Sequence, residues 1–237
     1  MDINNALKTL YESKWQGLQQ ALSKLEPHHY TNPFLLGFDS EQIALADLKV
    51  MIIGQETKGW CEQSPNHSID ELMSVYQDFR SKRNPYKGFK KSAFWQAFGY
   101  FEHAIRRANP TKNVHFCWNN INKIGRPAGK TGVSSSARNA ERQYFGVIAN
   151  EVALYAPDIV IFMTGPSRDG DIRFHFPDAT FSPLATQFKT REVAQVSSQC
   201  LPEKSVRIYH PSYFKMFHSV KPIALRGVLE QSLNKYA

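Results

Sequence analysis

Four short apolar runs, each ending abruptly at polar residues, are the feature of this sequence that most restricts its fold. They cover residues 48–53, 114–120, 158–165 and 205–212, and segments with helical patterning separate them. Nearly all-apolar strands are typical of a sheet that is covered on both faces. Strands that alternate with helices indicate a parallel sheet. The sequence therefore predicts an α/β fold.

The helical patterning is clearest near the N-terminus. Over residues 6–25, leucines and aromatic residues recur at spacings of three and four, and Pro27 follows. We expect one domain over residues 1–237, in which residues 1–47 form a helical extension. Further helices are expected over 69–80, 93–108, 138–155 and 219–235, and a short extra strand near 179–182.

The charge of the chain predicts a polyanionic partner, with DNA as the first candidate. The formal net charge is +8, and the positive residues are clustered. A solvated surface is the alternative explanation for any one cluster. The two clusters are Arg80, Lys82, Arg83, Lys87, Lys90 and Lys91, followed by Arg106, Arg107 and Lys112.

Several classes of protein are disfavoured. No apolar run approaches the roughly 20 residues that span a bilayer, and the first residues lack the pattern of a signal peptide, so a cytoplasmic location is expected. Three dispersed cysteines argue against a disulfide framework, and we expect Cys117 and Cys200 to be buried. No metal or cofactor is expected, because the adjacent pair His28 and His29 is a poor chelator.

Polar residues follow each of the four predicted strands. In open α/β sheets, ligands bind beyond the carboxyl ends of the strands, so these residues are expected to gather at one edge. Each of them also has a purely structural explanation, such as a helix cap or a turn. They are Gly54-Gln55-Glu56, Asn119-Asn120, Thr164-Gly165-Pro166-Ser167 and His210-Pro211-Ser212.

Two of these strand ends resemble motifs of the uracil-DNA glycosylase superfamily. "GQETKG" resembles its first motif, Gly-Gln-Asp-Pro-Tyr-His, and "IYHPSYFK" resembles its last, His-Pro-Ser-Pro-Leu-Ser. "FCWNN" and "MTGPS" stand where the family has a strand ending in a base-reading Asn and a Gly-Ser loop. The resemblance covers residues 48–215. It implies a three-layer αβα fold with a central, mainly parallel, four-stranded sheet.

The resemblance also implies roles for individual residues. Glu56 takes the place of the water-activating Asp, and His210 that of the His that steadies the departing base. Asn120, or Asn119 in an alignment shifted by one, takes the place of the base-reading Asn. Other base contacts are expected from Gln55, Lys58 and Trp60, and DNA contacts from Ser167, Ser212, Tyr213 and Phe214, with Phe214 as the inserted wedge and Trp118 as a further stacking face.

The chain departs from the family pattern directly after Glu56. Thr57 and Lys58 replace the Pro-Tyr pair that blocks bulky bases, and Gly59 replaces the closing His. The expected activity is therefore hydrolysis of the N-glycosidic bond of a flipped uracil-like or modified base in DNA. Two alternatives stay open: a catalytically silent nucleic-acid-binding module, and an enzyme that acts on small nucleosides.

Overall fold

The computed structural model describes residues 2–25, 30–61, 67–81, 92–127 and 132–230. The chain falls into two compact units, each built from three separate stretches. Unit 1 comprises residues 1–41, 55–85 and 120–155, and unit 2 comprises residues 42–54, 86–119 and 156–237. The expectation of one domain stays a prediction.

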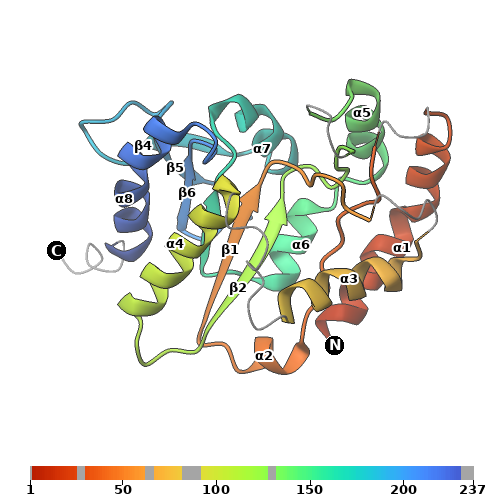
Figure 1. Ribbon diagram of the computed structural model, residues 1–237, viewed down its shortest axis with the longest axis horizontal. Coiled ribbons are helices and arrows are strands. Elements are labelled where there is room, and N and C mark those ends of the chain that lie inside the picture. Colours follow the sequence, from red (N-terminus) through yellow and green to blue (C-terminus); the bar gives the residue numbers. More distant parts are fainter. Residues whose placement is uncertain (1, 26–29, 62–66, 82–91, 128–131, 231–237) are drawn as a thin grey trace. The chain divides into compact units, whose positions relative to one another are not determined.

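The β-sheet belongs to unit 2, apart from the last residue of one strand. Most of its strands are labelled in Figure 1. Its strand order is β2-β1-β3-β6-β5-β4. The strands are β1 (Leu48–Gly54), β2 (Val114–Asn120), β3 (Ile159–Phe162), β4 (Thr180–Pro183), β5 (Val193–Ser197) and β6 (Lys204–Ile208).

The sheet is mixed. Strand β3 pairs in parallel with both β1 and β6, so that Ile161 lies between Ile52 and Val206. Strand β5 runs antiparallel to β6, and β4 antiparallel to β5. Every residue of β3 is buried, as is every residue of β1 except Lys49. This burial explains why these segments read as continuous apolar runs.

The prediction of an α/β fold is confirmed, and strands form in all four predicted places. The sheet has six strands in the described part of the chain, whereas the resemblance implied four. One of the other two, β4, is the short extra strand expected near 179–182, and β5 was not predicted. The residues of β4 are exposed or half-buried, so this strand shows little of the apolar pattern that marks the four predicted strands.

Aromatic residues pack helix α4 of unit 2 against the sheet. On α4 (Ala93–Ala108), Trp95 and Phe98 contact Trp118 and Phe116 of β2, at ring-centroid distances of 4.8 and 6.3 Å. Helix α8 (Phe214–Glu230) packs on β5, β6 and α4. It begins five residues before the predicted start. Residues 166–175 form the 3₁₀ turn η1 (Pro166–Arg168) and α7 (Asp169–His175).

Unit 1 is built around its first helix. Helices α3 (Ile69–Ser81), α5 (Ser135–Tyr144) and α6 (Ile148–Tyr155) pack against α1 (Ile3–Leu22), while the short α2 (Ser40–Ala44) crosses into unit 2. The prediction of one helix over 138–155 is wrong. The helix breaks at residues 145–147, where the Phe145 ring is buried against Tyr11 and Trp15.

Two further expectations concern the cysteines and membranes. Cys117 is buried as expected, but Cys200 is exposed because it lies in the turn after β5. Cys61 is half-buried, and burial raises the pKa of its thiol. Within the described ranges, no helix has both the length and the apolar character needed to cross a membrane.

Candidate functional site

The carboxyl ends of four adjacent strands carry the polar residues that the sequence singled out. In the sheet order, β2, β1, β3 and β6 are neighbours. Chain order reverses between β1 and β3, because β2 lies on one side of β1 and β3 on the other. Ligands of open α/β sheets bind at such a switch point. In unit 2, the ends of β1 and β3 are therefore where this rule would place a ligand.

His210 follows β6 and is held by its own turn. Its Nδ1 lies 2.7 Å from Ser212 Oγ and accepts a 3.3 Å hydrogen bond from the Ser212 backbone N–H. The Tyr213 N–H donates to the His210 carbonyl at 2.9 Å, which closes the turn. An Nδ1 that accepts a hydrogen bond leaves the proton of a neutral imidazole on Nε2. The turn thus presents an N–H donor.

Gly165 brings the end of β3 against this histidine. Its N–H donates to the Ile208 carbonyl at 2.9 Å, and its φ of +75° is one that L side chains rarely adopt. A Cβ at this position would lie 3.4 Å from the His210 backbone nitrogen. Glycine is therefore favoured by the backbone conformation, since the contact of a Cβ would be an ordinary one. Ser167, two residues further on, is exposed on η1.

Two large aromatic side chains after His210 face solvent. Tyr213 is 62% exposed and Phe214 is 65% exposed. Phe214 also contacts the His218 ring, with 4.2 Å between centroids. Beside it, unit 2 has a hollow of about 190 Å³, lined by residues of α4 and α8 together with Pro211. Exposed aromatic rings next to a histidine are suited to stacking on bases.

The segment after β1 belongs to unit 1. Gln55 and Glu56 are half-buried, Thr57 is buried and Lys58 is exposed. The Gln55 carbonyl accepts a 2.9 Å hydrogen bond from the Asn122 backbone, and Lys58 forms a parallel bridge with Arg126. Glu56 is therefore half-accessible on a backbone that is fixed to residues 122–126.

The tryptophans named as stacking faces are packed against other aromatic rings. Trp60 is half-buried, and its ring contacts Phe34 and Phe79 at centroid distances of 5.1 and 6.2 Å. Trp118 is 7% exposed and packs on Trp95. Trp118 is therefore part of the core, whereas Trp60 is only half-buried and its role as a base contact stays a prediction.

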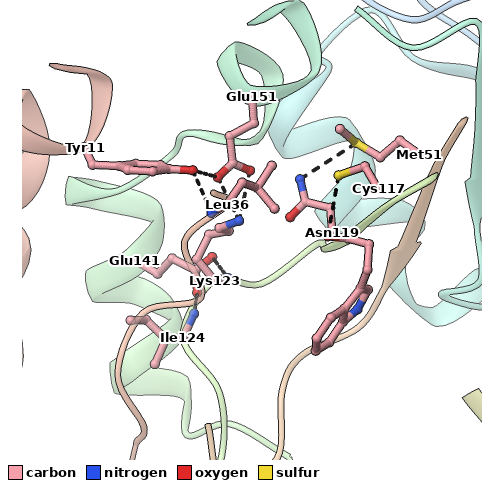
Figure 2. Close-up of polar contacts among 10 residues, drawn as sticks. Tyr11, Leu36, Met51, Cys117, Asn119, Lys123, Ile124, Glu141 and Glu151 are labelled. Carbon is pink, nitrogen blue, oxygen red and sulfur yellow. Dashed lines mark hydrogen bonds and ion pairs between the residues drawn. The ribbon is translucent and has the colours of Figure 1, made fainter. Parts of the chain in front are cut away.

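The two asparagines at the end of β2 are both buried. Asn119 is 0% exposed, and its amide lies 3.8 Å from the sulfur of Met51 on the neighbouring strand (Figure 2). Asn120 is 2% exposed. Its role as a base-reading residue stays a prediction.

Sequence reasoning missed two buried ion pairs. In unit 1, Lys123 and Glu151 are both 0% exposed, with 2.8 Å between Nζ and Oε1. In unit 2, Arg207 is 1% exposed and forks onto Asp169 through Nε and Nη2, at 2.9 and 3.1 Å. Burial raises the pKa of the Asp169 carboxyl and lowers that of Arg207. The sequence feature that could have indicated these ion pairs is a charged residue within an otherwise apolar run.

The basic residues are only partly described. Of the first cluster, Arg80 lies in α3, and Lys82, Arg83, Lys87, Lys90 and Lys91 lie outside the described residues. In the second cluster, Arg106 donates to the Val114 carbonyl at 2.8 Å and pairs with Glu102 at 3.2 Å. Arg107 and Lys112 are exposed. Arg106 is thus engaged in holding α4 to β2.

The chain is an α/β protein whose mixed sheet ends in polar residues at one edge. In the described ranges, no three side chains of His, Cys, Asp or Glu gather where they could hold a metal ion. Comparison of the chain with protein-family models, curated proteins and solved structures found no match.

Proposed function

We propose that this protein is a DNA glycosylase, which hydrolyses the N-glycosidic bond of a flipped uracil-like or modified base. The observation that carries the proposal is the strand order. In unit 2, β1 ends at the switch point of the sheet and β6 ends two strands along. Glu56 stands two residues after the last residue of β1 in the chain, and His210 stands two residues after the last residue of β6. A carboxylate and an N–H donor are the groups that this reaction requires.

The proposal includes the finer fold. Strands β2, β1, β3 and β6 form the mainly parallel four-stranded core of a three-layer αβα fold like that of the uracil-DNA glycosylases. Two parallel pairings, of β1 with β3 and of β3 with β6, support this assignment. The antiparallel strands β5 and β4 are then an extension at one side.

The chemistry follows from the charges that develop as the bond breaks. The sugar becomes positive and the departing base negative. The Glu56 carboxylate stabilises the sugar and orients the water that adds to C1′. The Nε2–H of His210 donates to the base as it takes the bonding electron pair, and Ser212 fixes the tautomer needed for this. Such hydrogen bonding to a developing charge is worth about 10²–10³-fold in rate.

The other site residues bind the DNA and the base. Ser167 and Ser212 contact the phosphates on either side of the target, and Tyr213 and Phe214 fill the gap that the flipped base leaves. Their exposure supports this role. Filling the gap offsets the few kcal/mol that flipping costs. Base contacts come from the other predicted residues: Gln55, Asn120, Lys58 and Trp60.

We propose further that the pocket accepts a base with bulk at the 5-position. Lys58 is exposed where the family has its blocking Tyr, and Gly59 has a φ of +64° where the family has a His. The test is base release from duplexes and single strands carrying uracil, hypoxanthine or 5-substituted pyrimidines, with free bases identified by mass. Cleavage of uracil alone would overturn this part of the proposal.

Two substitutions test the catalytic assignment. Glu56→Gln and His210→Ala are expected to lower the rate of base release at least about 10²-fold and to leave DNA affinity nearly unchanged. Glu12→Gln and His103→Ala make the same changes at exposed positions and should have no effect. If binding and base release fall together, the assigned roles are wrong.

A second candidate function is a DNA-binding module without catalysis. The exposed pair Tyr213 and Phe214 favours it, because stacking on bases needs no reaction. This function predicts binding in which log K falls by about 0.9 for each phosphate contacted per unit of log salt. It also predicts that no substrate in the panel yields a free base.

A further inference from the structure

The backbone on both sides of Glu56 is bonded to one segment of unit 1. The carbonyl of Gln55, the residue before it, accepts a 2.9 Å hydrogen bond from the Asn122 N–H. The carbonyl of Thr57, the residue after it, accepts a 3.0 Å bond from the Arg126 N–H. The position of Glu56 therefore depends on where residues 122–126 lie.

The segment around Glu56 and residues 122–126 are also in close van der Waals contact. Gly125 packs directly against Thr57, and an added Cβ would lie 2.9 Å from the Thr57 carbonyl oxygen and still closer to its hydroxyl. Thr57 itself is 4% exposed. A methyl group at position 125 would thus have to displace the Thr57 backbone.

Residues 122–126 are held in turn by a buried carboxylate. Glu141, on α5, is 2% exposed, and its two oxygens accept from the N–H groups of Lys123 and Ile124 at 2.6 and 2.9 Å. Hydrogen bonds to an ionised acceptor are about twice as strong as neutral ones. Glu141 therefore fixes the backbone next to the Asn122 bond.

The Lys123 side chain extends this network into the core of unit 1. Figure 2 shows its ammonium group directed at the Glu151 carboxylate, at 2.8 and 2.9 Å from the two oxygens. The Tyr11 hydroxyl donates to the same carboxylate at 2.7 Å and accepts from the Leu36 N–H at 3.0 Å. The Phe34 ring lies 4.9 Å from the ammonium nitrogen.

We propose that Glu141, Lys123 and Glu151 are positioning residues that hold the Glu56 carboxylate in its reactive place. The proposal rests on the proposed function for its catalytic consequence, but the structural coupling does not. Charges that no water reaches are retained at a cost in desolvation. Fixing one short segment from two helices gives them a role that a hydrophobic core could not fill as specifically.

Two variants disturb the segment in different ways. Glu141→Gln keeps the side-chain shape but turns an N–H₂ group toward one of the two backbone donors. Gly125→Ala leaves the charges intact and pushes on Thr57. Ser134→Ala is the matched control, because it removes the N-cap of the same helix, a 3.2 Å bond to the Ala137 N–H, without touching the Glu141 carboxylate.

Amide hydrogen exchange tests the coupling in the whole chain without any substrate. The Gly59 N–H donates to the Arg126 carbonyl at 2.8 Å and so reports on the same segment. Both variants are expected to raise exchange of the Gly59, Asn122 and Arg126 amides about tenfold, the factor that the loss of one hydrogen bond gives. Ser134→Ala should raise exchange in α5 alone. If these three amides exchange as in the wild-type protein, the inference is overturned whatever the activity.

Kinetics of base release test the consequence. Displacing a reacting group by about 1 Å lowers the rate about 10²-fold, so kcat should fall in both variants while KM for DNA stays within about twofold, since DNA contacts are unchanged. Equal kcat in Glu141→Gln and Ser134→Ala would overturn catalytic positioning. Failure of the wild-type protein to release any base would instead overturn the proposed function, and the exchange data would still decide the coupling.

Discussion

Each unit contains an ion pair whose cation is buried, and the two pairs differ in the exposure of their carboxylates. In unit 1, both Lys123 and Glu151 are fully buried. In unit 2, Arg207 is buried but Asp169 keeps 20% of its side-chain exposure. A carboxylate with some access to water retains part of its hydration. The structure therefore contrasts a closed pair with a partly open one.

The cations also differ in how their donors are used. The Arg207 guanidinium donates to both Asp169 oxygens and to the carbonyls of Thr190 and Arg191, at 2.8 to 3.1 Å. Lysine is a point charge with three donors, whereas arginine offers a fixed fork of five. The ammonium of the closed pair donates to both oxygens of one carboxylate, while the donors of the open pair are spread over Asp169 and two backbone carbonyls.

The largest effect is expected from Lys123→Met. It removes the ammonium group and leaves the Glu151 carboxylate buried without its cation, which costs about 3–5 kcal/mol of unfolding free energy. Urea unfolding measures it. The double variant with Glu151→Leu removes both charges and should recover most of the loss, because a well-packed apolar pair can replace a buried ion pair. No recovery would mean that packing, rather than charge, sets the cost.

Arg207→Met is expected to cost less, about 2–3 kcal/mol, because Asp169 can gain hydration where the Glu151 carboxylate cannot. Its control is Arg173→Met, which makes the same change at an exposed side chain over the same Phe181 ring and should cost no more than about 0.5 kcal/mol. A cost equal to that of Lys123→Met would remove the distinction between the two pairs.

A smaller effect is expected from Tyr11→Phe, which removes a single hydroxyl from the closed pair (Figure 2). The Leu36 N–H then loses its acceptor in a buried position, at a cost of about 1–2 kcal/mol. Tyr144→Phe, at a side chain that is 39% exposed, should be neutral in the same unfolding measurement. A neutral Tyr11→Phe would show that the hydroxyl adds nothing to the closed pair.

The two ion pairs could not be predicted from the sequence, although part of the fold could. Strands β1, β2, β3 and β6 could be predicted, because their apolar runs are buried in the sheet. The break at Phe145 could not, since helical periodicity continues across it and only the packing of its ring against Tyr11 shows the turn. The pattern of apolar residues in the sequence predicts which segments are buried, but it does not predict which residues far apart in the chain contact each other.

The candidate site likewise contains residues that could be predicted from the sequence and residues that could not. His210 and Gly165 could be placed at strand ends from the sequence, because a strand end is a local feature. The hydrogen bond of Ser212 to the imidazole follows from the turn and could be expected only in outline. Glu141 and Lys123 were missed, since their contacts join residues 17 or more positions apart in the chain.

The smallest expected effect is a pH dependence of the open pair. Burial raises the pKa of Asp169 above its unfolded value, and the positive charges of Arg207, Arg173 and Arg191 oppose this shift, Arg207 most strongly. In Arg207→Met the largest part of that opposition is lost, so the folded-state pKa rises further. A folded state with the higher pKa binds more protons, so the variant is most stable below the unfolded pKa of about 4. The variant then loses stability as the pH rises through the folded-state pKa of Asp169.

The loss of unfolding free energy caused by Arg207→Met should therefore be smaller near pH 4 than at pH 7, and urea unfolding at the two pH values measures it. Adding Asp169→Asn should abolish the difference, and a penalty that does not change with pH would show that Asp169 is hydrated enough to stay ionised without its partner.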